Sequence, residues 1–167
     1  MTVSRALGLS ALIVAVDQAV KAWVVASLPF GAQVDVIPNF FRLVHTRNRG
    51  IAFGLFSDVG PVGEVALVAV VMAIIVFVAL QFRHHAGRTL AATGLSLVLG
   101  GALGNLVDRF ARREVVDFLD FFVVIGGREH HWPAFNVADA CISVGAGCII
   151  LAEILTLRRR ERVPHPD

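Results

Sequence analysis

Charged residues are scarce in this chain of 167 residues. Only 17% of its residues are Asp, Glu, Lys or Arg, whereas 56% are hydrophobic, and its mean hydropathy is +0.74. Soluble domains contain about 25% charged and about 45–50% apolar residues. The excess of apolar side chains is therefore expected to face lipid. The net charge of +2 predicts no nucleic-acid partner, which would need a concentrated basic face.

Cysteine is also rare, and the two present are Cys141 and Cys148. On a helix their spacing places them roughly 10 Å apart, too far for a disulfide, so we interpret them as small core residues. The sequence contains no glycine-rich phosphate loop. It also lacks a Gly-x-Ser-Gly stretch, which argues against a serine protease of the rhomboid type. The adjacent His130 and His131 lack the spacing of a metal site, and we expect neither a metal nor a cofactor.

Four apolar stretches are long enough to cross a bilayer as helices, at residues 6–28, 62–82, 89–107 and 135–157. The sequence therefore predicts one membrane domain over residues 1–167, of the all-α class, built as a four-transmembrane-helix bundle. In the third stretch, Gly100 and Gly104 have the spacing that lets two membrane helices approach closely. Asp17 and Lys21 interrupt the first stretch, which argues against a cleaved signal peptide.

The segments between these stretches predict the orientation. Links 29–61 and 108–134 are long, and the tail 158–167 is short and basic. Because the tail arginines directly follow the last apolar stretch, the positive-inside rule places both termini in the cytoplasm and both long links outside. In the first long link, alternating residues flank the Pro38-Asn39 turn signal, which predicts a small extracytoplasmic β-sheet or loop subdomain.

Polar residues inside the apolar stretches need a reason, because each charge there costs at least a few kcal/mol. Asp17 and Lys21 are spaced i,i+4 and can neutralise one another. Asn105 and Asp108 share one face at the end of the third stretch. Two further residues, Asn136 and Asp139, share one face at the start of the fourth. Antiparallel neighbours would bring these two ends together on one side of the membrane.

Helix capping explains only part of this pattern. Asn136 is a plausible N-cap, and Asp139 is favoured near a helix N-terminus. Capping explains neither Asp117, which lies in an apolar setting, nor Asp108, whose charge opposes the dipole at a helix C-terminus unless Arg109 offsets it. Two close carboxylates cannot easily both ionise, so one can keep a proton while the other activates water. The residues alone leave open hydrolysis, a proton-coupled transporter or channel subunit, and a structural polar cluster.

Five motifs in order resemble the bacterial lipoprotein signal peptidase family, also called signal peptidase II. They read DQAVK at 17–21, NRGIAF at 48–53, GGALGNLVDR at 100–109, VVDF at 115–118 and FNVADA at 135–140. Each motif is weak alone, but together they cover most of the chain except its tail. The stretch VVIGGREHHWP at 123–133 matches none of them.

The resemblance implies an aspartic endopeptidase of the bacterial plasma membrane that removes signal peptides from diacylglyceryl-modified prolipoproteins. It implies that Asp117 and Asp139 are the catalytic pair and that the active site lies near the extracytoplasmic face. The expected partners are prolipoproteins and membrane lipids, and we expect a monomer. A transporter would instead distribute ionisable residues across the membrane. The residues that the resemblance assigns to supporting or substrate-binding roles are Asp17, Lys21, Asn48, Gly50, Asn105, Asp108, Arg109 and Asn136.

Overall fold

The computed structural model describes residues 1–48, 68–69, 71–73, 75–78, 80–81 and 89–161. Gly50 lies outside these ranges, and so does much of the predicted span 62–82. The residues of that span that are described as regular structure are helical. Among them, Val78 is buried in a cluster with Ala6, Leu95 and Leu99. The fourth membrane helix therefore stays a prediction.

Among the described residues, three helices are long and apolar enough to cross a bilayer: α1 (Val3–Ser27), α3 (Thr89–Arg112) and α4 (Val137–Glu161). The predicted ends of the first and fourth stretches fall close to these bounds. The third helix continues five residues beyond the predicted end at 107, because Asp108 is neutralised within the fold. It ends where Arg113 takes a left-handed φ of 66°, the conformation that commonly closes a helix.

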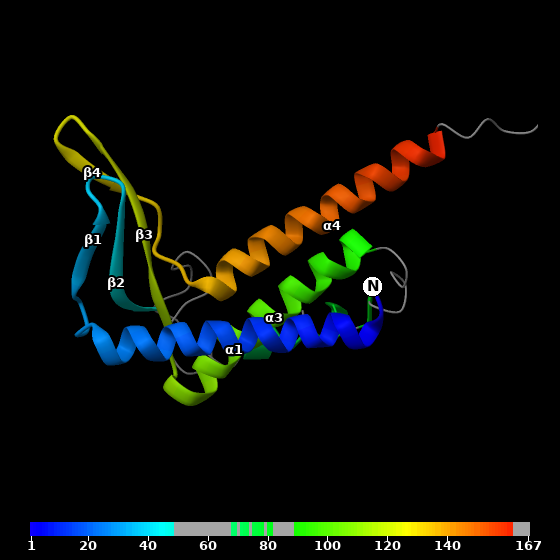
Figure 1. Ribbon diagram of the computed structural model, residues 1–167, viewed down its shortest axis with the longest axis horizontal. Coiled ribbons are helices and arrows are strands. Elements are labelled where there is room, and N and C mark those ends of the chain that lie inside the picture. Colours follow the sequence, from blue (N-terminus) through cyan, green and yellow to red (C-terminus); the bar gives the residue numbers. More distant parts are fainter. Residues whose placement is uncertain (49–67, 70, 74, 79, 82–88, 162–167) are drawn as a thin grey trace, which may run out of the picture.

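Helix α3 packs between α1 and α4, as Figure 1 shows. A Cβ atom added at Gly100 would lie 2.8 Å from Ile13 Cβ, and one at Gly104 would lie 2.8 Å from Asp17 Oδ2. Both glycines therefore face α1, which confirms the close approach predicted from their spacing. On the other side of α3, Gly101 allows the same closeness to α4. The cysteines of α4 are free and half-buried, so they are not the core residues that we predicted.

A four-stranded antiparallel sheet lies at one end of the helices, in the order β1 (Gln33–Ile37), β2 (Phe41–Asn48), β3 (Val115–Ile125) and β4 (Arg128–His131). The β1–β2 hairpin confirms the sheet predicted in the first link, and Asn39 turns it with a φ of 61°. The prediction of an apolar helical bundle with a small sheet is thus confirmed in this coarser form.

The β3–β4 hairpin was not predicted. Its two-residue loop is Gly126-Gly127, with φ values of 61° and 76°, and Ile125 pairs with Arg128 across it. Loops of this kind need positive φ at both central residues, which glycine adopts without strain. The Gly-Gly pair after the apolar run of β3 is the signal in the sequence that indicated a hairpin.

The first half of β3 holds the sheet against the helices. Val116 and Phe118 are buried with Val24 near the end of α1. Leu119 and Phe135 exchange backbone hydrogen bonds, which attaches the segment entering α4 to the same strand. Asp117 lies in this half of β3, beside the end of α1 and the segment entering α4. Figure 1 shows the sheet meeting the helices at that end.

Candidate active site

The N-terminus of α4 is capped by its own residues and by α1. Asn136 Oδ1 accepts from the backbone nitrogen of Asp139 at 3.0 Å, and Asp139 Oδ2 accepts from that of Asn136 at 3.3 Å. This reciprocal arrangement is a capping box, and it confirms Asn136 as the N-cap. Asp17 Oδ1 in α1 accepts from the backbone nitrogen of Ala138 at 3.0 Å. Three side-chain oxygens thus satisfy amides that a helix start leaves unpaired.

Asn136 also connects the two aspartates. Its side-chain Nδ2 donates to Asp117 Oδ1 at 2.8 Å, and its backbone nitrogen donates to Asp139 as described above. Asn136 is fully buried, and Asp117 is 3% exposed. The carboxylate from the sheet and the carboxylate from α4 therefore lie against one shared residue.

Asn105 joins this group from α3. Its Nδ2 donates to Asp139 Oδ1 at 2.8 Å, while its Oδ1 accepts from Lys21 Nζ at 2.9 Å and from Asn136 Nδ2 at 3.2 Å. Because an ammonium group can only donate, the amide oxygen of Asn105 must face Lys21. Its NH2 group must then face Asp139, so both oxygens of Asp139 accept hydrogen bonds.

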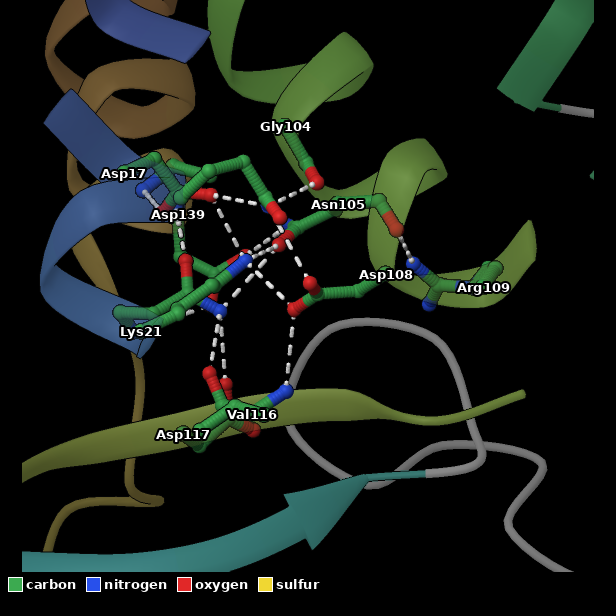
Figure 2. Close-up of polar contacts among 12 residues, drawn as sticks. Asp17, Lys21, Gly104, Asn105, Asp108, Arg109, Val116, Asp117 and Asp139 are labelled. Atoms are coloured by element: carbon green, nitrogen blue, oxygen red, sulfur yellow. Dashed lines mark hydrogen bonds and ion pairs between the residues drawn. The ribbon is translucent and has the colours of Figure 1, made fainter. Parts of the chain in front are cut away.

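A buried ion cluster lies beneath this group. Lys21 Nζ is 2.8 Å from Asp17 Oδ2 and 2.9 Å from Asp108 Oδ2, and all three side chains are fully buried. The predicted pairing of Asp17 with Lys21 is confirmed, and Figure 2 shows Asp108 as a further partner of the same ammonium group. A buried charge is tolerated only when it is paired and hydrogen-bonded, as each of these charges is.

Asp108 holds the strand as well as the ion cluster. Its Oδ2 accepts from the backbone nitrogen of Val116 at 3.2 Å, directly before Asp117. Its Oδ1 pairs with Arg112 and accepts from Gln18 Nε2 at 3.1 Å. The position of Asp117 therefore depends on a carboxylate in α3 that is itself fixed by α1.

Two members of this network were missed in the sequence. Arg112 was overlooked although its i,i+4 spacing from Asp108 is a signal for pairing. Gln18 binds Asp17, Asp108 and the carbonyl of Gly104, but nothing in its local sequence indicated this. Both residues add hydrogen bonds to carboxylates that are buried between α1 and α3.

The charge of Arg109 attracts that of Asp108, which agrees with the expectation that Arg109 offsets it. The direct ion pair of Asp108 is with Arg112, whereas Arg109 Nη1 donates to the backbone oxygen of Asn105 at 3.4 Å, within its own helix (Figure 2). The charge of Arg109 also attracts those of Asp139 and Asp117. Its hydrogen bonding to the 108–134 link stays a prediction.

Asn48 lies at the end of β2, where it pairs with Val115 in the sheet register. Its side chain forms a hydrogen bond with Asp117. This bond brings the second predicted motif to the site. Gly50, from the same motif, lies outside the described residues.

Burial changes the acidity of Asp117. Removal from water and, after it, the nearby charge of Asp139 raise its pKa, whereas hydrogen bonds from Asn48 and Asn136 and the charge of Lys21 lower it. The net result is a rise from 3.8 to about 7. At neutral pH a large fraction of Asp117 therefore carries a proton. A protonated carboxylic acid beside a carboxylate that only accepts hydrogen bonds can supply one acid and one base. Among the described residues, no group of His, Cys, Asp and Glu is arranged to hold a metal ion.

Comparison with known proteins agrees with these motifs. The family described as signal peptidase (SPase) II matches residues 9–155. The chain is 40% identical over 145 residues to the lipoprotein signal peptidase of Syntrophotalea carbinolica, covering 87% of this chain and 88% of that one. It is 45% identical over 146 residues to that of Oleidesulfovibrio alaskensis, covering 86% and 90%.

The fold has a solved counterpart. A structure described as a bacterial membrane enzyme superposes with a TM-score of 0.83 and 26% identity, covering 98% of this chain and 96% of that chain. These similarities do not support the alternative of a transporter or channel subunit. The family match, the relatives and the order of the motifs show that this chain belongs to the signal peptidase II family, whose members are peptidases of the aspartic type.

Proposed function

We propose that the chain removes signal peptides from diacylglyceryl-modified prolipoproteins and that Asp117 and Asp139 are its catalytic pair. The observation that carries this proposal is the bridge through Asn136, which binds both carboxylates at the junction of sheet and helices. The names of the relatives support the substrate class. The lipid-bearing substrate stays in the bilayer, so its scissile bond would present near the headgroups, at the depth of this junction.

The proposed reaction uses water directly. Asp139, whose two oxygens accept hydrogen bonds from Asn105 and Asn136, takes a proton from water as the water oxygen attacks the scissile carbonyl carbon. Asp117 gives its proton to the carbonyl oxygen, which forms a tetrahedral diol. Collapse of the diol breaks the C–N bond, and the leaving nitrogen takes the proton from Asp139. A diol hydroxyl returns a proton to Asp117, so the pair ends as it began.

The surroundings support these roles. Asn105 and Asn136 hold the pair without adding charge, since an amide side chain stays neutral at all relevant pH values. Lys21 and Asp17 act through Asn105 and the start of α4, so we assign them positioning roles. Asp108 is assigned a supporting role by its bond to the backbone of Val116 in β3, and Asn48 by its bond to Asp117. Arg109 is assigned one by its bond within α3. Gly50 is assigned to the substrate side by its motif alone.

The proposal extends to the whole chain. We infer one domain with four membrane spans in the bacterial plasma membrane, acting as a monomer in contact with membrane lipids. The basic residues at the C-terminal end of α4 support cytoplasmic termini, which would put the aspartates near the extracytoplasmic face. A C-terminal fusion to a reporter that is active only outside the cytoplasm should be inactive. An active fusion would contradict this orientation.

The test of the catalytic pair uses a lipid-modified prolipoprotein and a gel-shift readout. Asp117→Asn and Asp139→Asn should each reduce cleavage by at least about 10²-fold, since each removes one proton-transfer group. Asp35→Asn is the matched control, because Asp35 is an exposed carboxylate in the same sheet. It should cleave like the parent protein. Clear turnover by both site variants, with their helical content intact, would refute the pair.

A further inference from the structure

We propose that the outer half of the β3–β4 hairpin is a lipid anchor, whose apolar side chains enter the interfacial layer of the bilayer on the side where the sheet lies. The side chains concerned, called here the hairpin patch, are Val123 and Ile125 of β3, Trp132 directly after β4, and Phe40 from the adjacent β1–β2 turn. The patch is separate from the aspartate pair. Its occupant is the phospholipid surface.

The first observation is the position of the hairpin. The contacts of β3 with the helices come from its first half, through the bonds of Val116, Asp117 and Leu119 given above. Its second half pairs with β2 and β4, and Phe40 accepts from the backbone nitrogen of Phe122 at 2.9 Å. From Phe121 to Ile125 the strand advances about 13 Å. Figure 1 shows this half running across the direction of α1, away from the helix ends.

The second observation is the exposure of apolar side chains there. Ile125 is 64% exposed and Trp132 59%, and Phe40 and Val123 are also exposed. Phe40, Val123 and Trp132 line one hollow of about 280 Å³, together with Phe121, Phe122, His130 and His131. Contiguous exposed apolar surface marks a contact site, and tryptophan is enriched where membrane meets water.

The third observation is the charge balance of the hairpin. Its carboxylate, Glu129, pairs with Arg42 and also contacts His131, and the hydrogen bond from Arg42 holds the pKa of Glu129 below its usual value. Arg42 also lies 3.4 Å from Asp120, and its guanidinium covers the ring of Phe122. One guanidinium thus offsets part of the acidic charge of Asp35, Asp120 and Glu129, and Arg128 beside the Gly-Gly loop is placed to meet lipid phosphates.

The closeness of the hairpin to the membrane end of α4 identifies phospholipid as the partner of the hairpin patch. Trp132 precedes Val137, the first residue of a helix able to cross the membrane, by only five residues. Five residues span at most about 18 Å even when extended. The segment is further held by the pairing of Phe135 with Leu119. The hairpin therefore emerges at the level where α4 meets the membrane surface and extends over the neighbouring lipids.

Anchoring of the hairpin would also affect the aspartate pair, and this consequence rests on the proposed function. Asp117 and Ile125 belong to the same strand, so fixing the hairpin in the interface also fixes the depth at which Asp117 meets the scissile bond. The hydrogen bonds of β4 and the paired charges of Arg42 make the hairpin a stiff extension of that strand.

The two tryptophans allow a direct test in the full-length chain reconstituted into phosphatidylcholine–phosphatidylglycerol vesicles. Trp23→Phe leaves Trp132 as the only tryptophan. Trp132→Phe leaves Trp23, which is 53% exposed on α1 and serves as the control for lipid contact. Lipids brominated close to the headgroup should quench Trp132 by about two-fold or more, as expected for an interfacial tryptophan. Adding Val123→Ser and Ile125→Ser to the Trp23→Phe chain should reduce this quenching.

The opposite result is equally clear. If aqueous acrylamide quenches Trp132 while brominated lipids do not, and Trp23 is still quenched by those lipids, the hairpin is not in the interface. A response of Trp132 to added prolipoprotein but not to brominated lipid would make the patch a substrate surface and overturn the proposal. Adding the inactivating Asp117→Asn to the Trp23→Phe chain should leave the quenching of Trp132 unchanged, so this test is independent of the catalytic proposal.

Discussion

Asn136 donates from its side-chain amide to Asp117 across 2.8 Å, and this bond links the N-cap of α4 to a carboxylate of the sheet. The same residue caps α4 through its side-chain oxygen. Asn136 therefore both caps the N-terminus of α4 and holds the carboxylate of Asp117 near that of Asp139. The two tasks use different atoms, so they can be separated by substitution.

Replacing Asn136 with serine should separate capping from bridging. Serine can still cap α4, but it lacks the amide donor that reaches Asp117. We expect about a 10²-fold loss of cleavage and a loss of about 1–3 kcal/mol of stability, because the buried oxygens of Asn105 and Asp117 lose a donor. Asn136→Ala should lose the cap as well and cost about 1 kcal/mol more. Full activity in the serine variant would show that the bond to Asp117 is dispensable.

The proposed pair predicts a particular pH profile. Burial and the charge of Asp139 raise the pKa of Asp117 to about 7, so its proton is present below that pH and lost above it. Because the acid must donate that proton, kcat/KM should fall as pH rises through about 7. Asn136→Ser removes a hydrogen bond that lowers this pKa, so the fall should move to higher pH. Rates that stay level well above pH 7 in the parent protein would contradict the role of Asp117.

Lys21→Met should destabilise the fold. It leaves the buried carboxylates of Asp17 and Asp108 without their shared cation. Breaking a buried ion pair by removing one partner costs about 3–5 kcal/mol, which thermal unfolding in detergent can measure. Adding Asp108→Asn to Lys21→Met should recover part of the loss, since it removes one uncompensated charge. A double variant less stable than Lys21→Met would argue against this charge balance.

A pair of glycine substitutions tests the helix packing. A Cβ at Gly101 would lie 2.4 Å from the carbonyl oxygen of Ala138, so Gly101→Ala must push α3 and α4 apart. We expect a loss of about 1–3 kcal/mol in unfolding experiments. Gly8→Ala in α1 is the matched control, because a Cβ there meets nothing within 4 Å. It should be neutral or stabilise by up to about 1 kcal/mol. Equal effects of the two substitutions would contradict the packing.

Local features of the site could be read from the sequence. The cap at Asn136, the Asp17–Lys21 pair and the close approach at Gly100 and Gly104 each depend on spacing within one helix, and the structure confirms them. The β3–β4 hairpin also has a local signal, the Gly126-Gly127 pair, although the hairpin was not predicted.

Contacts between distant segments could not be read in this way. Asn105 and Asp139 are separated by 34 residues, and nothing local shows that their side chains bond. The choice of Arg112 over Arg109 as the ion-pair partner of Asp108 depends on which side of α3 faces α1. The two arginines are three positions apart on α3, so the rotation of the helix, which is set by packing, decides which of them pairs with Asp108.

By itself the sequence determined the membrane environment, the ends of α1 and α4 to within a few residues, and the family. These depend on apolar content, periodicity and motif order, which are properties of the chain as written. Only the tertiary structure decided that Asn136 joins Asp117 to Asp139 and that burial raises the pKa of Asp117 to about 7. Hydrogen bonds and desolvation depend on distances of a few ångströms between segments, and only the packed fold fixes those distances.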